Sequence, residues 1–268
     1  MQVGFLLVAA CGGSGIDTAA ADSTTTTPAS TTATKATATS TEAGLDSEVL
    51  VSAAAALTDA FAGVESAFET ANPGSDVVLN LGSSSSLREQ ILEGAPADVF
   101  ASANISNMDQ VVEAGEAVEP EIFAHNLLQI AVPAGNPAGI TGLDDFADEH
   151  LVIGLCAEEV PCGSFGREAL AKAGVTPAMD TNEPDVRALL TKVEVGELDA
   201  GIVYLTDVLS TDGAVEGVVI PDEFNVVAEH PIAALVNAPN PDAAAAFVEF
   251  VLSKDGKTIL TSFGFLSP

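Results

Sequence analysis

From residue 47 onward, short β-rich runs alternate with longer stretches of helical spacing, and this alternation limits the chain to a small set of folds. The run EVLVSA begins it, and apolar side chains then recur every three or four positions from Leu57 until Asn72-Pro73-Gly74 ends the pattern. The predicted strands and helices alternate over residues 48–53, 57–68, 76–81, 87–92 and 97–101. Since this order of strands and helices is typical of parallel pairing, we predict a parallel sheet with helices on its faces.

A second α/β set follows a break in this pattern. Residues 126–133 form a predicted strand long enough to cross between two domains, and residues 232–236 form another long apolar run. Further strands and helices are predicted at residues 151–155, 164–173, 186–195, 200–204 and 242–252. We therefore predict an α/β fold of two lobes joined by two crossing strands around a ligand cleft. The predicted lobes are residues 47–127 plus 233–268 and residues 128–232.

The first 46 residues have a different composition. A short apolar run ends at Cys11-Gly12-Gly13, which is similar to the end of a bacterial lipoprotein signal whose Cys becomes lipidated. The run is too short to span a bilayer, which takes about 20 apolar residues, and the alternative is an apolar start with a buried Cys. In residues 23–42, 13 of 20 residues are Ser or Thr, and such a segment cannot bury enough surface to fold. We predict a signal remnant at 1–11, lipidation of Cys11, a disordered tether at 12–46, and a body held outside the membrane.

The chain is strongly acidic. Its 268 residues include 8 Lys+Arg and 39 Asp+Glu, which gives a formal net charge of −31. Nucleic acids and anionic lipid surfaces are recognised through basic patches, and eight dispersed cations cannot form one. Trp is absent and Tyr204 is the only tyrosine, so a stacking platform for bases or sugars is not expected.

Cys156 and Cys162 lie six positions apart. Outside the cytosol such a pair is typical of a disulfide, and closing so small a loop contributes about 2 kcal/mol. The alternatives are a thiol nucleophile or a metal site, but a metal site needs further ligands at suitable spacing, and His125, His150 and His230 are isolated. We predict a disulfide, no direct protein ligand to a metal, and no cofactor.

Two helix starts carry most of the functional signal. In residues 52–58 (SAAAALT) a strand runs directly into a helix through small residues, and residues 82–86 (GSSSS) again join a strand to a helix. Helix N-termini expose unpaired N–H groups and carry about half a positive charge, so two of them facing a cleft form an anion site without any cation. Serine hydroxyls add rotatable donors, although a serine run is also typical of a solvated loop or a helix cap.

The order of the motifs resembles a known family. The chain contains VSAAAALTDAF at 51–61, LGSSSSLREQILEGAPADVFASA at 81–103, VPCGSFGREAL at 160–170, EPDVRALL at 183–190, GELDAGIVYLTD at 196–207 and SFGF at 262–265. This series resembles the periplasmic molybdate-binding proteins of ABC transporters over about residues 48–268. The resemblance implies a type II periplasmic-binding-protein fold that closes on a dehydrated tetrahedral oxyanion held by neutral donors.

The resemblance also implies which residues hold the ligand. The first-lobe contacts fall on Ala56 and Ser84, and the second-lobe contacts fall on the backbone N–H groups of Cys162 and Val186 and on the phenol of Tyr204. For Tyr204, the alternative is a half-buried ring at the sheet edge with its hydroxyl in water. We expect the ligand contact, because this is the only Tyr and it lies at the expected place.

One position departs from the family. Its members carry a hydroxyl residue where this chain has Ala56, so a side-chain donor is missing and the affinity is expected to fall by about tenfold. The substitute donors are Ser52, Ser83, Ser85 or a bridging water.

Three functions remain to be compared. The first is a transport receptor that captures molybdate or tungstate, holds the metal only as its oxyanion and delivers it to an ABC permease. The second keeps this fold with another oxyanion such as sulfate or phosphate, although discrimination of hydrogen phosphate would need a buried carboxylate that no motif supplies. The third is an extracellular serine hydrolase using residues 83–86, but the chain has neither GxSxG nor a His at a suitable strand end. We predict the first function, with a monomeric protein and no enzymatic activity.

Arg88 and Arg187 lie close to helix starts assigned to the site. A guanidinium there has the geometry to clamp an anion in bidentate fashion. The alternative is an ion pair with some of the 39 acidic residues, and this is what we expect.

Overall fold

The first lobe is built on three parallel strands in the computed structural model, which describes residues 47–268. β1 (Glu48–Ala54) pairs on one side with β2 (Asp76–Gly82) and on the other with β3 (Val99–Ala101). The predicted alternation is confirmed here, since α1 (Thr58–Ala71) and α2 (Ser84–Leu92) connect these strands. The predictions for residues 1–11, Cys11 and residues 12–46 lie outside the described residues.

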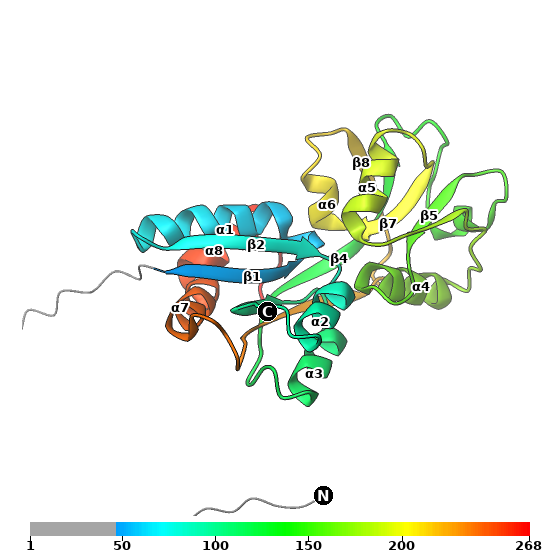
Figure 1. Cartoon of the computed structure of the whole chain (residues 1–268). Coiled ribbons are helices and arrows are strands. Elements are labelled where there is room, and N and C mark those ends of the chain that lie inside the picture. Colours follow the sequence, from blue (N-terminus) through cyan, green and yellow to red (C-terminus); the bar gives the residue numbers. More distant parts are fainter. Residues whose placement is uncertain (1–46) are drawn as a thin grey trace, which may run out of the picture. The chain divides into compact units, whose positions relative to one another are not determined.

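Helices cover both faces of this part of the sheet. Successive side chains of a strand point to opposite faces, and β3 shows the result: Val99 and Ala101 enter one apolar cluster and Phe100 another. The first cluster is shared with α1, α7 (Pro241–Leu252) and α8 (Lys254–Ser262), and the second with α2 and α3 (Ile105–Glu113). Figure 1 shows α2 and α3 lying together, apart from α7 and α8. Neither α3 nor α8 was expected from the sequence.

The second lobe continues the sheet. Its parallel strands are β5 (Ile153–Cys156), β6 (Thr181–Glu183) and β7 (Ala200–Tyr204), and β8 (Val215–Val219) pairs with β4 (Glu121–Pro133). The helices are α4 (Pro161–Ala173), α5 (Val186–Glu194) and the short α6 (Leu205–Leu209), with a 3-10 turn η2 (Leu143–Ala147). With β9 (Val227–Ala234), the strand order along the sheet is β2-β1-β3-β9-β4-β7-β5-β6, and β8 lies off this path.

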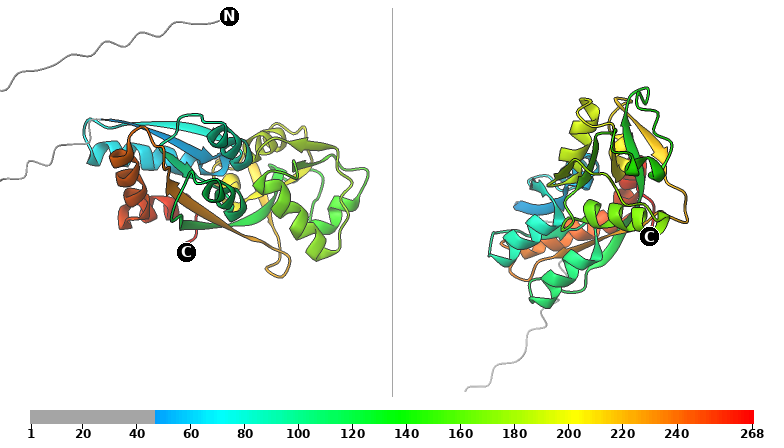
Figure 2. Two further views of the ribbon diagram at one scale, coloured as in Figure 1. Left: turned by 60° about the horizontal axis from the view of Figure 1, so that its bottom comes forward. Right: turned by 90° about the vertical axis from the view of Figure 1, so that its right-hand side faces the viewer.

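Two strands cross between the lobes, as predicted. β4 (Glu121–Pro133) pairs with β9 (Val227–Ala234) from Glu121 to Leu127 and then with β7 from Leu128 to Ala131. The two strands can be followed side by side in Figure 2. Both begin five residues before the predicted positions, because polar residues such as Glu121 and Glu229 interrupt the apolar run at the start of each strand.

One helix start differs in a way that matters for the site. The helix predicted at 164–173 begins at Pro161, a residue suited to the first helical position because its missing N–H has no acceptor there anyway. Cys162 therefore lies inside the first turn of α4 rather than before it. Among residues 47–268, no helix is both long and apolar enough to cross a membrane.

The first-lobe core depends on close packing of α1. Val64 is fully buried in this helix, whereas Val118 lies in a loop with 62% of its surface exposed. We expect Val64→Ala to lower the free energy of unfolding by about 2 kcal/mol, because it removes two buried methyl groups and leaves a cavity. Val118→Ala is the control and should change it by less than about 0.5 kcal/mol. Urea denaturation measures both, and equal losses would contradict this packing.

Candidate functional site

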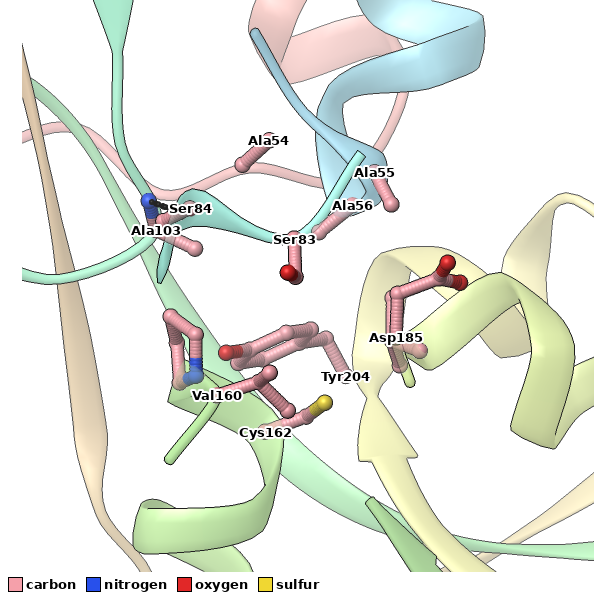
Figure 3. A pocket seen from close by; sticks show the side chains of 12 residues that line it. Ala54, Ala55, Ala56, Ser83, Ser84, Ala103, Val160, Cys162, Asp185 and Tyr204 are labelled. Atoms are coloured by element: carbon pink, nitrogen blue, oxygen red, sulfur yellow. Dashed lines mark hydrogen bonds between the residues drawn. The ribbon is translucent and has the colours of Figure 1, made fainter. Parts of the chain in front are cut away.

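One pocket receives all five residues that the sequence assigned to the ligand. It lies between segments of both lobes and has an empty volume of about 220 Å³, including its opening to solvent. Figure 3 shows Ser83 of the first lobe pointing toward the Tyr204 ring of the second. The lining residues are Ala54, Ala55, Ala56, Ser83, Ser84, Ala103, Val160, Pro161, Cys162, Asp185, Val186 and Tyr204.

The first-lobe wall consists of small residues and hydroxyls at two helix starts. β1 runs into a 3-10 turn, η1 (Ala55–Leu57), whose alanines leave the backbone accessible from the pocket. Ser83 caps α2, with its Oγ accepting the N–H of Ser86 at 3.2 Å. Ser84 is buried, and its Oγ accepts the N–H of Ala103 at 2.9 Å, drawn as a dashed line in Figure 3. This bond orients the Ser84 hydroxyl and leaves its proton available for a ligand.

The second-lobe wall is formed by two more helix starts. Cys162 lies in the first turn of the 13-residue α4, and Val186 is the first residue of the nine-residue α5. N–H groups in a first turn have no acceptor within the helix and lie at the positive end of its dipole. Asp185 caps α5 by accepting the N–H of Ala188 at 2.9 Å, and in Figure 3 its carboxylate points away from Tyr204.

The predicted disulfide is confirmed. Cys156, the last residue of β5, is bonded to Cys162 with their Cα atoms 5.7 Å apart. Arg167 braces the same loop, because its Nη1 donates to the carbonyls of Cys156 at 2.7 Å and Gly163 at 3.0 Å. Gly163 is required by this close approach, since a Cβ there would collide with the backbone of Ala157. The backbone at the start of α4 is therefore held in place by a covalent bond and by packing.

Tyr204 is the residue whose environment most directly indicates a ligand. It is 1% exposed at the end of β7, and its hydroxyl has no hydrogen-bond partner in the described part of the chain. Burial, with a smaller contribution from the negative charge of Asp207, raises the pKa of the phenol well above its usual value of 10. The phenol therefore stays protonated as a donor, and the alternative of a half-buried ring with its hydroxyl in water is wrong.

Asp207 lies behind Tyr204 and was not anticipated from the sequence. It is fully buried at the start of α6, and its Oδ2 accepts the backbone N–H of Tyr204 at 3.0 Å. Its Oδ1 is 3.6 Å from Nε of Arg187 and has no hydrogen-bond partner among the described residues. Burial raises the pKa of this carboxyl to about 7, against the opposing effects of Arg187 and the Tyr204 N–H; Asp59 and Asp185 raise it further.

The hydrogen-bond donors that line the pocket carry no charge. No Lys, Arg or His is among its lining residues within the described chain. Both arginines near the helix starts are ion-paired, as expected: Arg88 with Glu89 at 3.0 Å and Arg187 with Asp59. His230 is buried behind Tyr204, with ring centroids 6.1 Å apart, and burial lowers its pKa to about 4. The serines of the pocket therefore have no histidine or lysine base among the lining residues of the described chain.

The structure also reveals lining residues that the sequence did not single out. Ala103 follows β3, and Val160 and Asp185 each precede a helix of the second lobe. Their positions after a strand or before a helix are the only sequence signal that marks them. Of the substitute donors proposed for Ala56, Ser83 lines the pocket, whereas Ser52 and Ser85 are buried outside its lining.

The two lobes, the crossing strands and the pocket between them define the class of two-lobed periplasmic binding proteins. The solved structure of the Azotobacter vinelandii periplasmic molybdate-binding protein superposes with a TM-score of 0.72 at 18% identity, covering 82% of this chain and 99% of that chain. The sulfate-binding protein SubI from Mycobacterium tuberculosis H37Rv gives a TM-score of 0.75 at 19% identity, covering 82% and 87%. At these identities the likeness shows the fold alone.

Sequence comparison gives the family. A family model described as bacterial extracellular solute-binding protein matches residues 49–266, and the chain belongs to this family. It is 38% identical over 221 residues to the molybdate-binding protein ModA of Mycobacterium tuberculosis (strain ATCC 25618 / H37Rv), covering 82% of this chain and 85% of that protein. It is 31% identical over 235 residues to ModA of Escherichia coli (strain K12), covering 82% and 89%. The resemblance predicted from the motifs is thereby confirmed.

The unpartnered Tyr204 hydroxyl has a consequence for the ligand-free protein. We expect Tyr204→Phe to leave the free energy of unfolding unchanged or to raise it by up to about 1–3 kcal/mol, because the variant no longer buries a hydroxyl without a partner. Urea denaturation of ligand-free protein measures this. A loss above about 1 kcal/mol would indicate that the hydroxyl has a structural partner.

Asp207 predicts a pH dependence of stability. Because its pKa rises from 3.8 to about 7 on folding, the folded protein binds the proton more tightly than the unfolded chain. The stability that the protonated Asp207 contributes is therefore fully present below about pH 4. It is lost as the pH rises to about 7, by up to about 1.4 kcal/mol per pH unit. Asp207→Asn keeps an acceptor for the Tyr204 N–H but has no carboxyl that titrates. From pH 5 to pH 7, the free energy of unfolding of this variant should therefore fall less, or rise more, than that of the wild type. Identical changes in the two proteins would contradict a shifted Asp207.

Proposed function

We propose that this protein is an extracytoplasmic receptor that captures molybdate or tungstate and delivers it to an ABC permease. The observation that carries this proposal is the buried Tyr204 hydroxyl, which has no hydrogen-bond partner in the part of the chain that the structure describes and lies at a pocket formed by helix starts of both lobes. Dipoles and neutral donors at such a site bind a dehydrated anion without needing a cation. The molybdate-binding relatives that share 38% and 31% of their residues with this chain support the choice of oxyanion.

The proposed contacts divide between the lobes. Ser84 donates its hydroxyl and Ala56 its backbone N–H from the first lobe, while Cys162 and Val186 donate backbone N–H groups and Tyr204 its phenol from the second. Each donor meets an oxygen of the tetrahedral anion, so molybdenum or tungsten has no direct protein ligand. The protein acts by binding and release, as a monomer, without a cofactor or a catalytic step.

The same proposal covers the location of the protein. Its family is described as extracellular, and a lipid on Cys11 followed by a Ser/Thr-rich tether at 12–46 would keep the binding body close to the permease. The lobes proposed from the sequence, 47–127 plus 233–268 and 128–232, would then close on the anion.

Thermal unfolding with added oxyanions tests the ligand. Molybdate or tungstate at 1,000 times its dissociation constant should stabilise the folded protein by about 4 kcal/mol and raise the melting temperature. Sulfate and phosphate are the competing arms, because the fold is shared with a sulfate-binding protein. A shift with sulfate or phosphate alone would change the proposed ligand, and no shift with any of the four would refute an oxyanion receptor.

Variants of the pocket test the proposed contacts. Tyr204→Phe and Ser84→Ala should each weaken molybdate binding about 10- to 100-fold, because a hydrogen bond to a charged group contributes about 1.5–3 kcal/mol. Ser86→Ala is the matched control, since this exposed serine of the same run lies outside the pocket lining. Ala56→Ser should strengthen binding by restoring a hydroxyl. Titration calorimetry measures all four, and unchanged affinity in both Tyr204→Phe and Ser84→Ala would exclude these contacts.

A further inference from the structure

Arg187 joins the two lobes beside the pocket. It is the second residue of α5 in the second lobe, and its guanidinium pairs with Asp59 in the first turn of α1 in the first lobe. Its Nε also donates to the carbonyl of Ala55 at 3.4 Å, and its Nη1 donates to Ser210 at 3.1 Å. One side chain therefore bonds to both lobes.

Arg187 contacts or adjoins residues that line both walls of the pocket. Ala55 and its neighbour Ala56 line the first-lobe side of the pocket, and Val186, next to Arg187, lines the second-lobe side. Arg187 itself is absent from the pocket lining. It lines an adjacent pocket together with Asp59, Ala56 and Ser210, and the empty volume of this pocket is about 590 Å³, including its opening to solvent. The guanidinium therefore contacts the segments that form the pocket walls from outside the oxyanion pocket.

Asp207 extends this connection to Tyr204. Its Oδ1 lies 3.6 Å from Nε of Arg187, and its Oδ2 accepts the N–H of Tyr204. The start of α5, the η1 turn and the end of β7 are therefore linked through one guanidinium. Each of these three segments carries a residue that lines the pocket.

We propose that Arg187, Asp59 and the Ala55 carbonyl form an interlobe latch that holds the oxyanion pocket closed and sets the rate at which the ligand leaves. The inference rests on the proposed function. Opening the lobes separates Arg187 from Asp59 and Ala55, so the latch must break before the anion is released. Arg187 and Asp59 are positioning residues, because neither lines the oxyanion pocket.

Direct electrostatics and the latch predict opposite effects of a substitution at Asp59 on ligand binding. Asp59 is an acid close to an anion site, so removing its charge should strengthen binding if charge alone matters. If the latch matters, the same substitution should weaken binding. The sign of the effect of Asp59→Asn therefore separates the two explanations.

The experiment measures association and dissociation rates of molybdate by stopped flow. We expect Asp59→Asn and Arg187→Gln each to raise the dissociation rate about tenfold, with the association rate changed less than twofold. The double variant should match Arg187→Gln alone, because both substitutions remove the same interaction. Arg187→Lys should recover part of the slow dissociation.

Two controls match these changes in charge. Arg88→Gln also removes one positive charge beside a helix start, but Arg88 bonds to Glu89 and Asn107 within its own lobe. Asp242→Asn also removes an acid from the first turn of a first-lobe helix, and Asp242 is exposed. Both controls should leave the dissociation rate within twofold of the wild type.

The remaining outcomes decide against the latch. A slower dissociation or faster association in Asp59→Asn would show direct electrostatics, and equal effects of Arg88→Gln and Arg187→Gln would show an effect of net charge. Unchanged rates in both latch variants would refute the latch while leaving the proposed function intact. If the wild type binds no molybdate, the proposed function fails. Small-angle scattering of the ligand-free proteins then tests the latch, which requires a larger radius of gyration in Asp59→Asn and Arg187→Gln.

Discussion

The antiparallel pairing of β4 with β9 is the interaction on which the two-lobed arrangement depends. β4 pairs with β9 over residues 121–127 and with β7 over residues 128–131, so a single strand belongs to the sheet of both lobes. A hydrogen-bonded ladder allows much less freedom than a loop of the same length. As a result, β1 from one side and β7 from the other end at the same pocket, and the helices that follow them begin there.

The pocket combines an anion-binding character with a strongly acidic chain. The net charge is −31, yet at physiological salt charges more than about 8 Å apart are largely screened. Groups next to an anion therefore act on it most strongly, and those that line this pocket include residues at helix N-termini, serine hydroxyls and a phenol that burial keeps protonated. The nearby guanidinium of Arg187 is neutralised by Asp59. The lining thus offers donors without a fixed positive charge.

The elements closest to the site followed well from the sequence, and the differences have local causes. α1 has clear helical spacing of apolar residues, and Asn72-Pro73-Gly74 separates it from β2, while β1 and β7 are short β-rich runs. α8 was missed because it begins directly after α7 ends, capped by Ser253, and buries only Gly256 and Leu260. α4 starts three residues earlier than expected because proline is accommodated in the first turn of a helix, so Pro161 begins it.

The sequence by itself determined the α/β class, the disulfide pair and, through its motif order, the five residues that meet in one pocket. These depend on local patterns, which a chain carries whatever its partners in space. Only the tertiary structure decided that the Tyr204 hydroxyl is buried without a partner among residues 47–268, that Asp207 lies behind it, and that Arg187 reaches Asp59. Arg187 and Asp59 are 128 positions apart, and no local pattern specifies which acid a cation will meet. Their contact arises from the way β4 and β9 bring two separately folded helix starts to the same place.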